Sequence, residues 1–73
     1  MSNRLNNSKL KKYRSIRGFT QKELSELSGV NIKSITLYEQ HPEKLLSASV
    51  GTLYKLSDAL NCNIEDLLNK ENF

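Results

Sequence analysis

The chain has 73 residues, a net charge of +3 and a single cysteine, and these properties exclude several classes of protein. A domain of this length buries only about 60% of the surface that its unfolded chain exposes, which leaves little room for an enzyme with a deep pocket. Cys62 can form no intrachain disulfide, and because Cys62 and His41 are alone of their kinds we expect no zinc or other metal site. No cofactor is expected, and no small-molecule substrate is evident from the sequence. Neither a signal peptide nor an apolar run of roughly 20 residues is present, so we expect a cytoplasmic protein without a membrane partner.

The charges are distributed unevenly along the chain. Residues 1–22 carry seven Lys and Arg and no acidic residue, whereas residues 23–73 carry four lysines and eight acids. The first segment therefore has a net charge of +7 and the second a net charge of −4. A cationic segment of this kind indicates a polyanionic partner such as nucleic acid, although a solvated basic helix would have the same composition.

Apolar residues recur at spacings of three and four and nowhere alternate with polar ones over the length of a strand. The sequence therefore predicts an all-α domain of five short helices. The first helix is expected to run from about Leu5 to Arg17, with Leu10 and Tyr13 on its inner face. Gly18 should end it, because glycine adopts the left-handed conformation of a helix C-cap at no steric cost.

The second helix is predicted to start at Thr20, which forms a Thr-x-x-Glu capping box with Glu23. Leu24 and Leu27 are expected to face the core of the domain. Gly29 should end this helix, again in the left-handed conformation.

The third helix is predicted to follow Asn31, a favourable N-cap residue, and to place Ile35 and Tyr38 on one buried face. Pro42 disfavours helix at the residue before it, so residues 42–48 are expected to form a loop. The fourth helix is capped by Ser49 and ends near Asn61, and a short fifth helix completes the domain. The core residues expected from the fourth helix are Leu53, Leu56 and Leu60. Asn63 and Asp66 resemble a further capping arrangement, which opens the last helix with Ile64, Leu67 and Leu68.

Residues 20–39 have the pattern of two helices joined by a tight turn that contains a glycine. Ser25 is small enough to lie where the two helices touch, and Gly29 supplies the positive φ that the turn needs. If Ile35 and Tyr38 face the core, the opposite side of the third helix presents its polar and exposed residues to a partner.

That opposite side has the composition of a surface that reads the major groove of DNA. A wheel drawn at about 100° per residue places Lys33, Thr36 and Leu37 there, with Ile32 at the flank. Lysine can donate to guanine, threonine can donate or accept, and an apolar side chain can contact the thymine methyl group. Gln21 and Lys22 begin the second helix, where free backbone N–H groups favour a phosphate.

The run Phe-Thr-Gln-x-x-Leu at residues 19–24, followed by Gly-Val-x-x-x-x-Ile-x-x-Tyr-Glu at residues 29–39, resembles the Cro/lambda-repressor-like (XRE) family of helix-turn-helix domains. The resemblance implies a compact five-helix domain at about residues 8–68, with the helix-turn-helix at about 20–39 and short flexible tails. It also implies a repressor-like transcriptional regulator that binds double-stranded operator DNA sequence-specifically, commonly as a homodimer, with residues 32–39 in the major groove.

By match of position, the resemblance places Gln21 on the phosphate backbone and pairs Arg14 with Glu39. The positions of Ile32 and Leu37 are often polar in that family, so base recognition by hydrogen bonds is expected to rest chiefly on Lys33. The complete set of predicted DNA-binding residues is Thr20, Gln21, Lys22, Asn31, Ile32, Lys33, Ser34, Thr36 and Leu37.

A second hypothesis is a protein-interaction module, for example the antitoxin of a toxin–antitoxin pair, since members of this family serve in that role. Few residues lie outside the predicted domain to form a segment that wraps a toxin, which favours the DNA-binding hypothesis. An enzyme is not expected, because the chain has no paired-carboxylate site, no Ser/His/Asp set and no phosphate loop.

Overall fold

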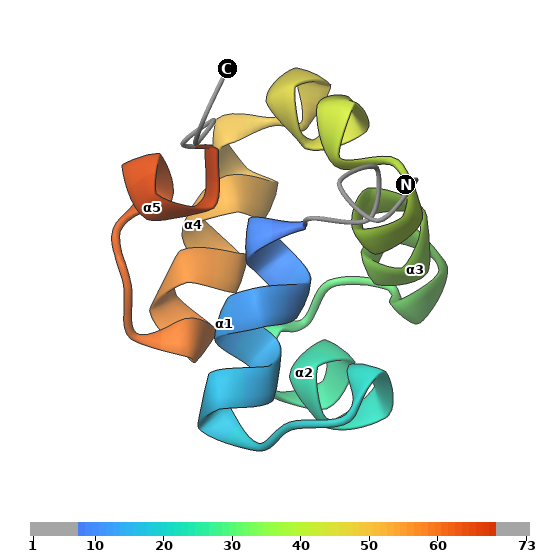
Figure 1. Ribbon diagram of the computed structural model, residues 1–73, viewed down its shortest axis with the longest axis vertical. Helices are drawn as coiled ribbons and strands as arrows, with labels where there is room; N and C mark the ends of the chain where they lie inside the picture. The colour runs from blue at the N-terminus through green and yellow to red at the C-terminus, as the bar shows by residue number, and fades with distance from the viewer. Residues whose placement is uncertain (1–7, 69–73) are drawn as a thin grey trace, which may run out of the picture.

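The computed structural model describes residues 8–68, and this part of the chain forms five α-helices and one short 3₁₀ helix without any strand (Figure 1). The all-α prediction is confirmed. In chain order the elements are α1 (Lys9–Arg17), α2 (Gln21–Ser28), α3 (Ile32–Gln40), the 3₁₀ helix η2 (Pro42–Ser47), α4 (Val50–Leu60) and α5 (Ile64–Leu68). No helix in this described part is long and apolar enough to cross a membrane.

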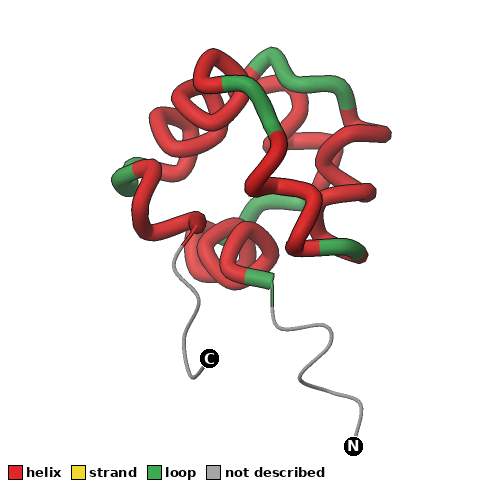
Figure 2. Tube along the Cα trace, turned by 90° about the horizontal axis from the view of Figure 1, so that it is seen from above, coloured by secondary structure: helices red, strands yellow, loops and turns green. Residues whose placement is uncertain are grey.

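The helices enclose one apolar core, with α1 in the middle of the view in Figure 1. α1 contacts α3, α4 and α5, while α2 packs on α3 and α4. Short loops join the helices, as the view from above shows (Figure 2). The buried apolar side chains come from every one of these elements and are Leu10, Leu24, Val30, Ile35, Leu45, Leu53, Leu56, Leu60 and Leu67.

The helix ends follow the predicted capping residues closely. Gly18 has φ 80° at the end of α1, and Asn61 has φ 56° at the end of α4, so both are left-handed C-caps. The Ser49 side chain accepts a hydrogen bond from the backbone N–H of Thr52 at the start of α4. Before α5, the Asp66 carboxylate accepts a hydrogen bond from the backbone N–H of Asn63 at 2.9 Å, which is a capping arrangement.

Three predictions about the helices are wrong in detail. α1 begins at Lys9, with Ser8 as its N-cap, and not near Leu5, which lies outside the described residues. Residues 42–47 are a 3₁₀ helix instead of a loop, with Pro42 in its first turn and Leu45 buried against the core. Proline does end α3, but its fixed φ also suits the first turn of a new helix.

The third error concerns the inner face of α2, since Leu27 is 60% exposed. The helix has only eight residues, and its buried side is narrow enough to be filled by Leu24, which is fully buried. Leu27 instead lines a shallow, open depression together with Phe19, Glu23 and Glu26. The three-residue spacing of the two leucines therefore did not define a common buried face.

A connection between distant segments fixes the end of α1. The Arg17 guanidinium donates from Nε to the carbonyl of Leu60 at 2.8 Å and from Nη2 to the carbonyl of Asn61 at 3.1 Å. These carbonyls belong to the C-terminus of α4, where a positive charge is favoured by the helix dipole. Arg17 thus ties the end of α1 to the end of α4, a structural role that its place in the basic segment did not predict.

Candidate nucleic-acid interface

Short-range hydrogen bonds hold α2 at each of its two ends. Thr20 caps α2 with a complete capping box, in which the Glu23 N–H donates to the Thr20 hydroxyl and the Thr20 N–H donates to the Glu23 carboxylate. Gly29 ends α2 with φ 80° and donates its N–H to the Ser25 carbonyl. Gly29 thus gives the turn between α2 and α3 the positive φ that the sequence predicted.

Ser25 and Asn31 complete the turn. The Ser25 hydroxyl donates to the Val30 carbonyl at 2.6 Å, so this small side chain ties α2 to the turn as well as allowing close packing. The Asn31 side-chain oxygen accepts from the Lys33 N–H at 2.7 Å and caps α3. Asn31 is exposed at the start of α3.

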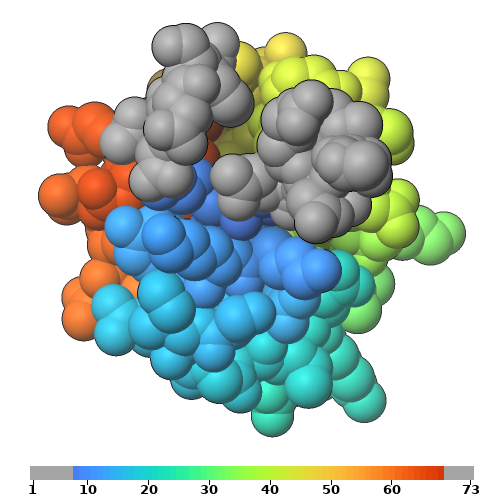
Figure 3. Space-filling view, viewed as in Figure 1, coloured from blue at the N-terminus to red at the C-terminus, as the bar shows by residue number. Residues whose placement is uncertain are grey.

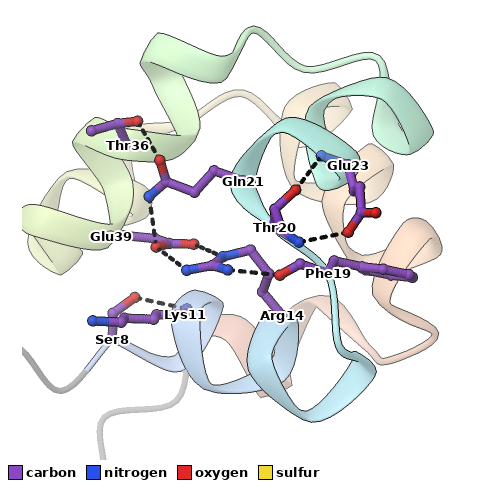
Figure 4. Close-up of polar contacts among 9 residues, drawn as sticks. All are labelled: Ser8, Lys11, Arg14, Phe19, Thr20, Gln21, Glu23, Thr36 and Glu39. Atoms are coloured by element: carbon purple, nitrogen blue, oxygen red, sulfur yellow. Dashed lines mark hydrogen bonds and ion pairs between the residues drawn. The ribbon is translucent and has the colours of Figure 1, made fainter.

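A buried ion pair joins α1 to the end of α3. Arg14 donates from Nε to Glu39 Oε2 at 2.6 Å and from a second guanidinium nitrogen to Glu39 Oε1 at 2.9 Å, and it also donates to the Phe19 carbonyl at 2.7 Å (Figure 4). The Glu39 side chain is only 4% exposed and that of Arg14 14%. The hydrogen bonds to Glu39 raise the pKa of Arg14 above its ordinary value. Arg14 and Glu39 therefore lie together as the family resemblance implied.

Gln21 and Thr36 extend this pair toward the outer side of α3. Gln21 donates from Nε2 to Glu39 Oε1 at 2.9 Å, and its side-chain oxygen accepts from the Thr36 hydroxyl at 2.9 Å. A continuous chain of hydrogen bonds thus runs from Arg14 through Glu39 and Gln21 to Thr36 (Figure 4). The family resemblance implied the pair of Arg14 and Glu39, which are 25 residues apart, but no sequence signal predicted the extension of this pair through Gln21 to Thr36.

The face of α3 that points away from the core is open. Ile32 and Leu37 are each 40% exposed, Lys33 is exposed and Ser34 is half-buried, whereas Ile35 is fully buried on the opposite side. The acidic residue of α3 is Glu39, which is buried, so the exposed face of this helix carries no acidic side chain. The helix therefore presents one cation and two apolar side chains.

The cationic segment is less uniform than its sequence suggests. Arg14 is neutralised by Glu39. Arg17 keeps its net charge, but its guanidinium is bound to backbone carbonyls at the end of α4. Lys11, Lys12 and Lys22 are exposed on α1 and α2. The surfaces of these two helices adjoin one another on one face of the molecule (Figure 3).

The geometry defines a helix-turn-helix, in which α3 is fixed by one face and exposed on the other. Within the described residues no group of three His, Cys, Asp or Glu side chains could hold a metal ion. The family model for the Cro/C1-type HTH DNA-binding domain matches residues 9–71. The chain belongs to this family of DNA-binding domains. Neither a curated protein nor a solved structure matches the chain significantly.

Proposed function

We propose that the protein is a sequence-specific transcriptional regulator of the repressor type, which binds double-stranded operator DNA in the cytoplasm as a homodimer. In this proposal α3 lies in the major groove. The observation that carries it is the asymmetry of α3, whose inner face is fixed by Ile35 and Glu39 while Ile32, Lys33 and Leu37 remain exposed on the outer face. A helix held in this way can enter the groove without losing its packing on the domain.

The start of α2 supports the proposal from a second direction. Thr20, Gln21 and Lys22 lie together at a helix N-terminus, where free N–H groups and the helix dipole favour a phosphate. Gln21 keeps one amide hydrogen beyond the one it gives to Glu39, and Lys22 is exposed. We assign these three residues to backbone contacts, which position α3 without reading the sequence themselves.

Base recognition is assigned to the outer side of α3. Lys33 can donate to the guanine O6 and N7 acceptors, and Ile32 and Leu37 can contact thymine methyl groups. Asn31 and Ser34, at the first turn of α3, are placed at adjacent base edges or phosphates. With a single cation on this helix, most of the affinity is expected to come from phosphate contacts and to depend strongly on salt.

The decisive experiment is selection of bound duplexes from random DNA, followed by measurement of affinity at several salt concentrations. We expect a pseudo-palindromic site whose half-sites are about 34 Å, or one helical turn, apart. An asymmetric site recognised by one copy of the chain would refute the homodimer. Binding without sequence preference would refute sequence-specific regulation while leaving a role in general DNA binding.

The exposed apolar side chains on α3 also favour a second candidate, a protein-interaction module such as an antitoxin. Ile32 and Leu37 lie on the same helix and would fit an apolar partner surface as well as thymine methyl groups. The two functions differ in their response to charge. Replacing Lys33 by methionine should weaken specific DNA binding by about 1–3 kcal/mol, whereas it should leave an apolar protein contact intact or strengthen it.

A further inference from the structure

We propose that the Thr36 hydroxyl reaches DNA only as a hydrogen-bond acceptor and therefore recognises the exocyclic amino group of an adenine or a cytosine. A free threonine hydroxyl can either donate or accept, so by itself it discriminates poorly between base edges. In this protein the chain of hydrogen bonds that begins at Arg14 removes one of those options. The inference rests on the proposed DNA-binding function and specifies what one residue of that site selects.

The first step is the orientation of the Gln21 side-chain amide. Glu39 forms two hydrogen bonds with the Arg14 guanidinium, and a carboxylate in this pair can only accept. The amide of Gln21 lies 2.9 Å from Glu39 Oε1 and must present its nitrogen there, because the opposite orientation would bring two acceptor oxygens into contact. The Gln21 oxygen consequently points toward α3.

The second step is the orientation of the Thr36 hydroxyl. Its Oγ1 lies 2.9 Å from the Gln21 oxygen, which has no hydrogen to give. The hydroxyl must therefore donate its single proton to Gln21. Only the lone pairs of Thr36 Oγ1 remain for any other partner. The charge of Arg14 thus sets the polarity of a group that lies three hydrogen bonds away from it.

The third step is the position of Thr36 on the exposed side of α3. It lies one turn after Lys33 and directly before Leu37, and it is half-buried while those two neighbours are exposed. In the major groove the donors are the N6 amino group of adenine and the N4 amino group of cytosine, whereas N7, O6 and O4 are acceptors. An acceptor-only hydroxyl bonds the amino groups and opposes the acceptors.

The test uses functional-group deletions in the duplex selected for the proposed operator. At each base pair, adenine is replaced by purine, which lacks the amino group, or cytosine by 2-pyrimidinone, which lacks it likewise. Guanine or adenine is separately replaced by its 7-deaza analogue, which lacks the N7 acceptor. Each duplex is titrated with the wild-type protein, with Thr36→Val, which removes the hydroxyl at nearly constant volume, and with Thr36→Ser, which retains it.

We expect Thr36→Val to weaken binding of the intact duplex about two- to tenfold. At one base pair, deletion of the amino group should weaken the wild-type protein and Thr36→Ser by a similar factor and leave Thr36→Val unaffected. Deletion of N7 should lower the affinity of the wild-type protein and of Thr36→Val by the same factor at every base pair. The inference would be overturned if the loss of affinity in Thr36→Val depended on an N7 deletion, or if it depended on none of the deletions. The proposed DNA-binding function would stand in either case.

A second variant tests the chain of hydrogen bonds itself. Gln21→Met keeps the length of the side chain but removes the acceptor, so the Thr36 proton becomes free to donate. We expect a uniform loss of affinity from the lost phosphate contact, together with a relaxed base preference at the single pair that Thr36 contacts. If the preference at that pair stayed as in the wild-type protein, the polarity argument would be overturned. Failure of the wild-type protein to bind any duplex would instead remove the proposed function, and this inference with it.

Discussion

Removal of the Glu39 carboxylate is expected to be among the most destabilising single changes in the domain. Glu39→Leu leaves two donors of the Arg14 guanidinium, and the amide of Gln21, facing an apolar side chain. Breaking a buried ion pair by removing one partner costs about 3–5 kcal/mol. Because Arg14 retains its bond to the Phe19 carbonyl and is partly accessible, we expect the lower part of that range, about 3 kcal/mol.

The converse variant, Arg14→Met, is expected to lower the free energy of unfolding by at least as much. Arg14→Met preserves the packing of the aliphatic stem but leaves the carboxylate of Glu39, which is 4% exposed, with Gln21 as its remaining partner. The double variant Arg14→Met/Glu39→Leu buries no unpaired charge. The double variant should lose less unfolding free energy than the two single variants lose together, and the difference should be about 2 kcal/mol or more.

Urea unfolding followed by far-ultraviolet circular dichroism measures these differences, because the chain contains no tryptophan. A domain of this size has a total stability of about 4–11 kcal/mol, so a loss of 3 kcal/mol is readily detected. Glu26→Gln, which changes an exposed acid on α2, is the matched control and should stay within about 0.5 kcal/mol of the wild-type protein. Additive costs for the two single variants would show that Arg14 and Glu39 do not stabilise the fold as a pair.

Three further outcomes are expected. Lys33→Ala should weaken binding of the selected operator by about 1–3 kcal/mol, and unchanged affinity would refute its assignment to the bases. Gly29→Ala should lower the free energy of unfolding by about 1–2 kcal/mol, measured in urea, because Gly29 has a positive φ. Gly51 lies inside α4 without a positive φ, so Gly51→Ala should raise the free energy of unfolding by up to about 1 kcal/mol. Equal effects of the two substitutions would show that the positive φ of Gly29 does not matter. Burial, with a smaller contribution from Asp66, raises the pKa of the Cys62 thiol, so the folded state retains a proton that the unfolded chain loses above about pH 8.5. The free energy of unfolding should therefore fall as pH rises through that range, and it should do so less steeply in Cys62→Ala; identical pH profiles would contradict this.

Local signals in the sequence predicted local structure well. Capping residues such as Thr20, Ser49 and Asn61 depend on contacts within three or four residues, so their effect can be read from neighbouring positions. The same holds for Gly29, where the turn needs a positive φ. Predictions of burial, which depend on the neighbouring helices, were less accurate. Leu27 has the spacing of a core residue, but the small area that α2 buries was already filled by Leu24.

For the helix-turn-helix, the sequence alone determined where α2 and α3 start and end and which face of α3 is buried, because periodicity and capping are local properties. Only the tertiary structure decided what the polar residues do. Gln21 and Thr36 read as two independent surface groups in the sequence, yet both belong to one chain of hydrogen bonds that starts at a buried ion pair. Hydrogen-bond polarity depends on which atoms meet across helices, and packing alone determines that.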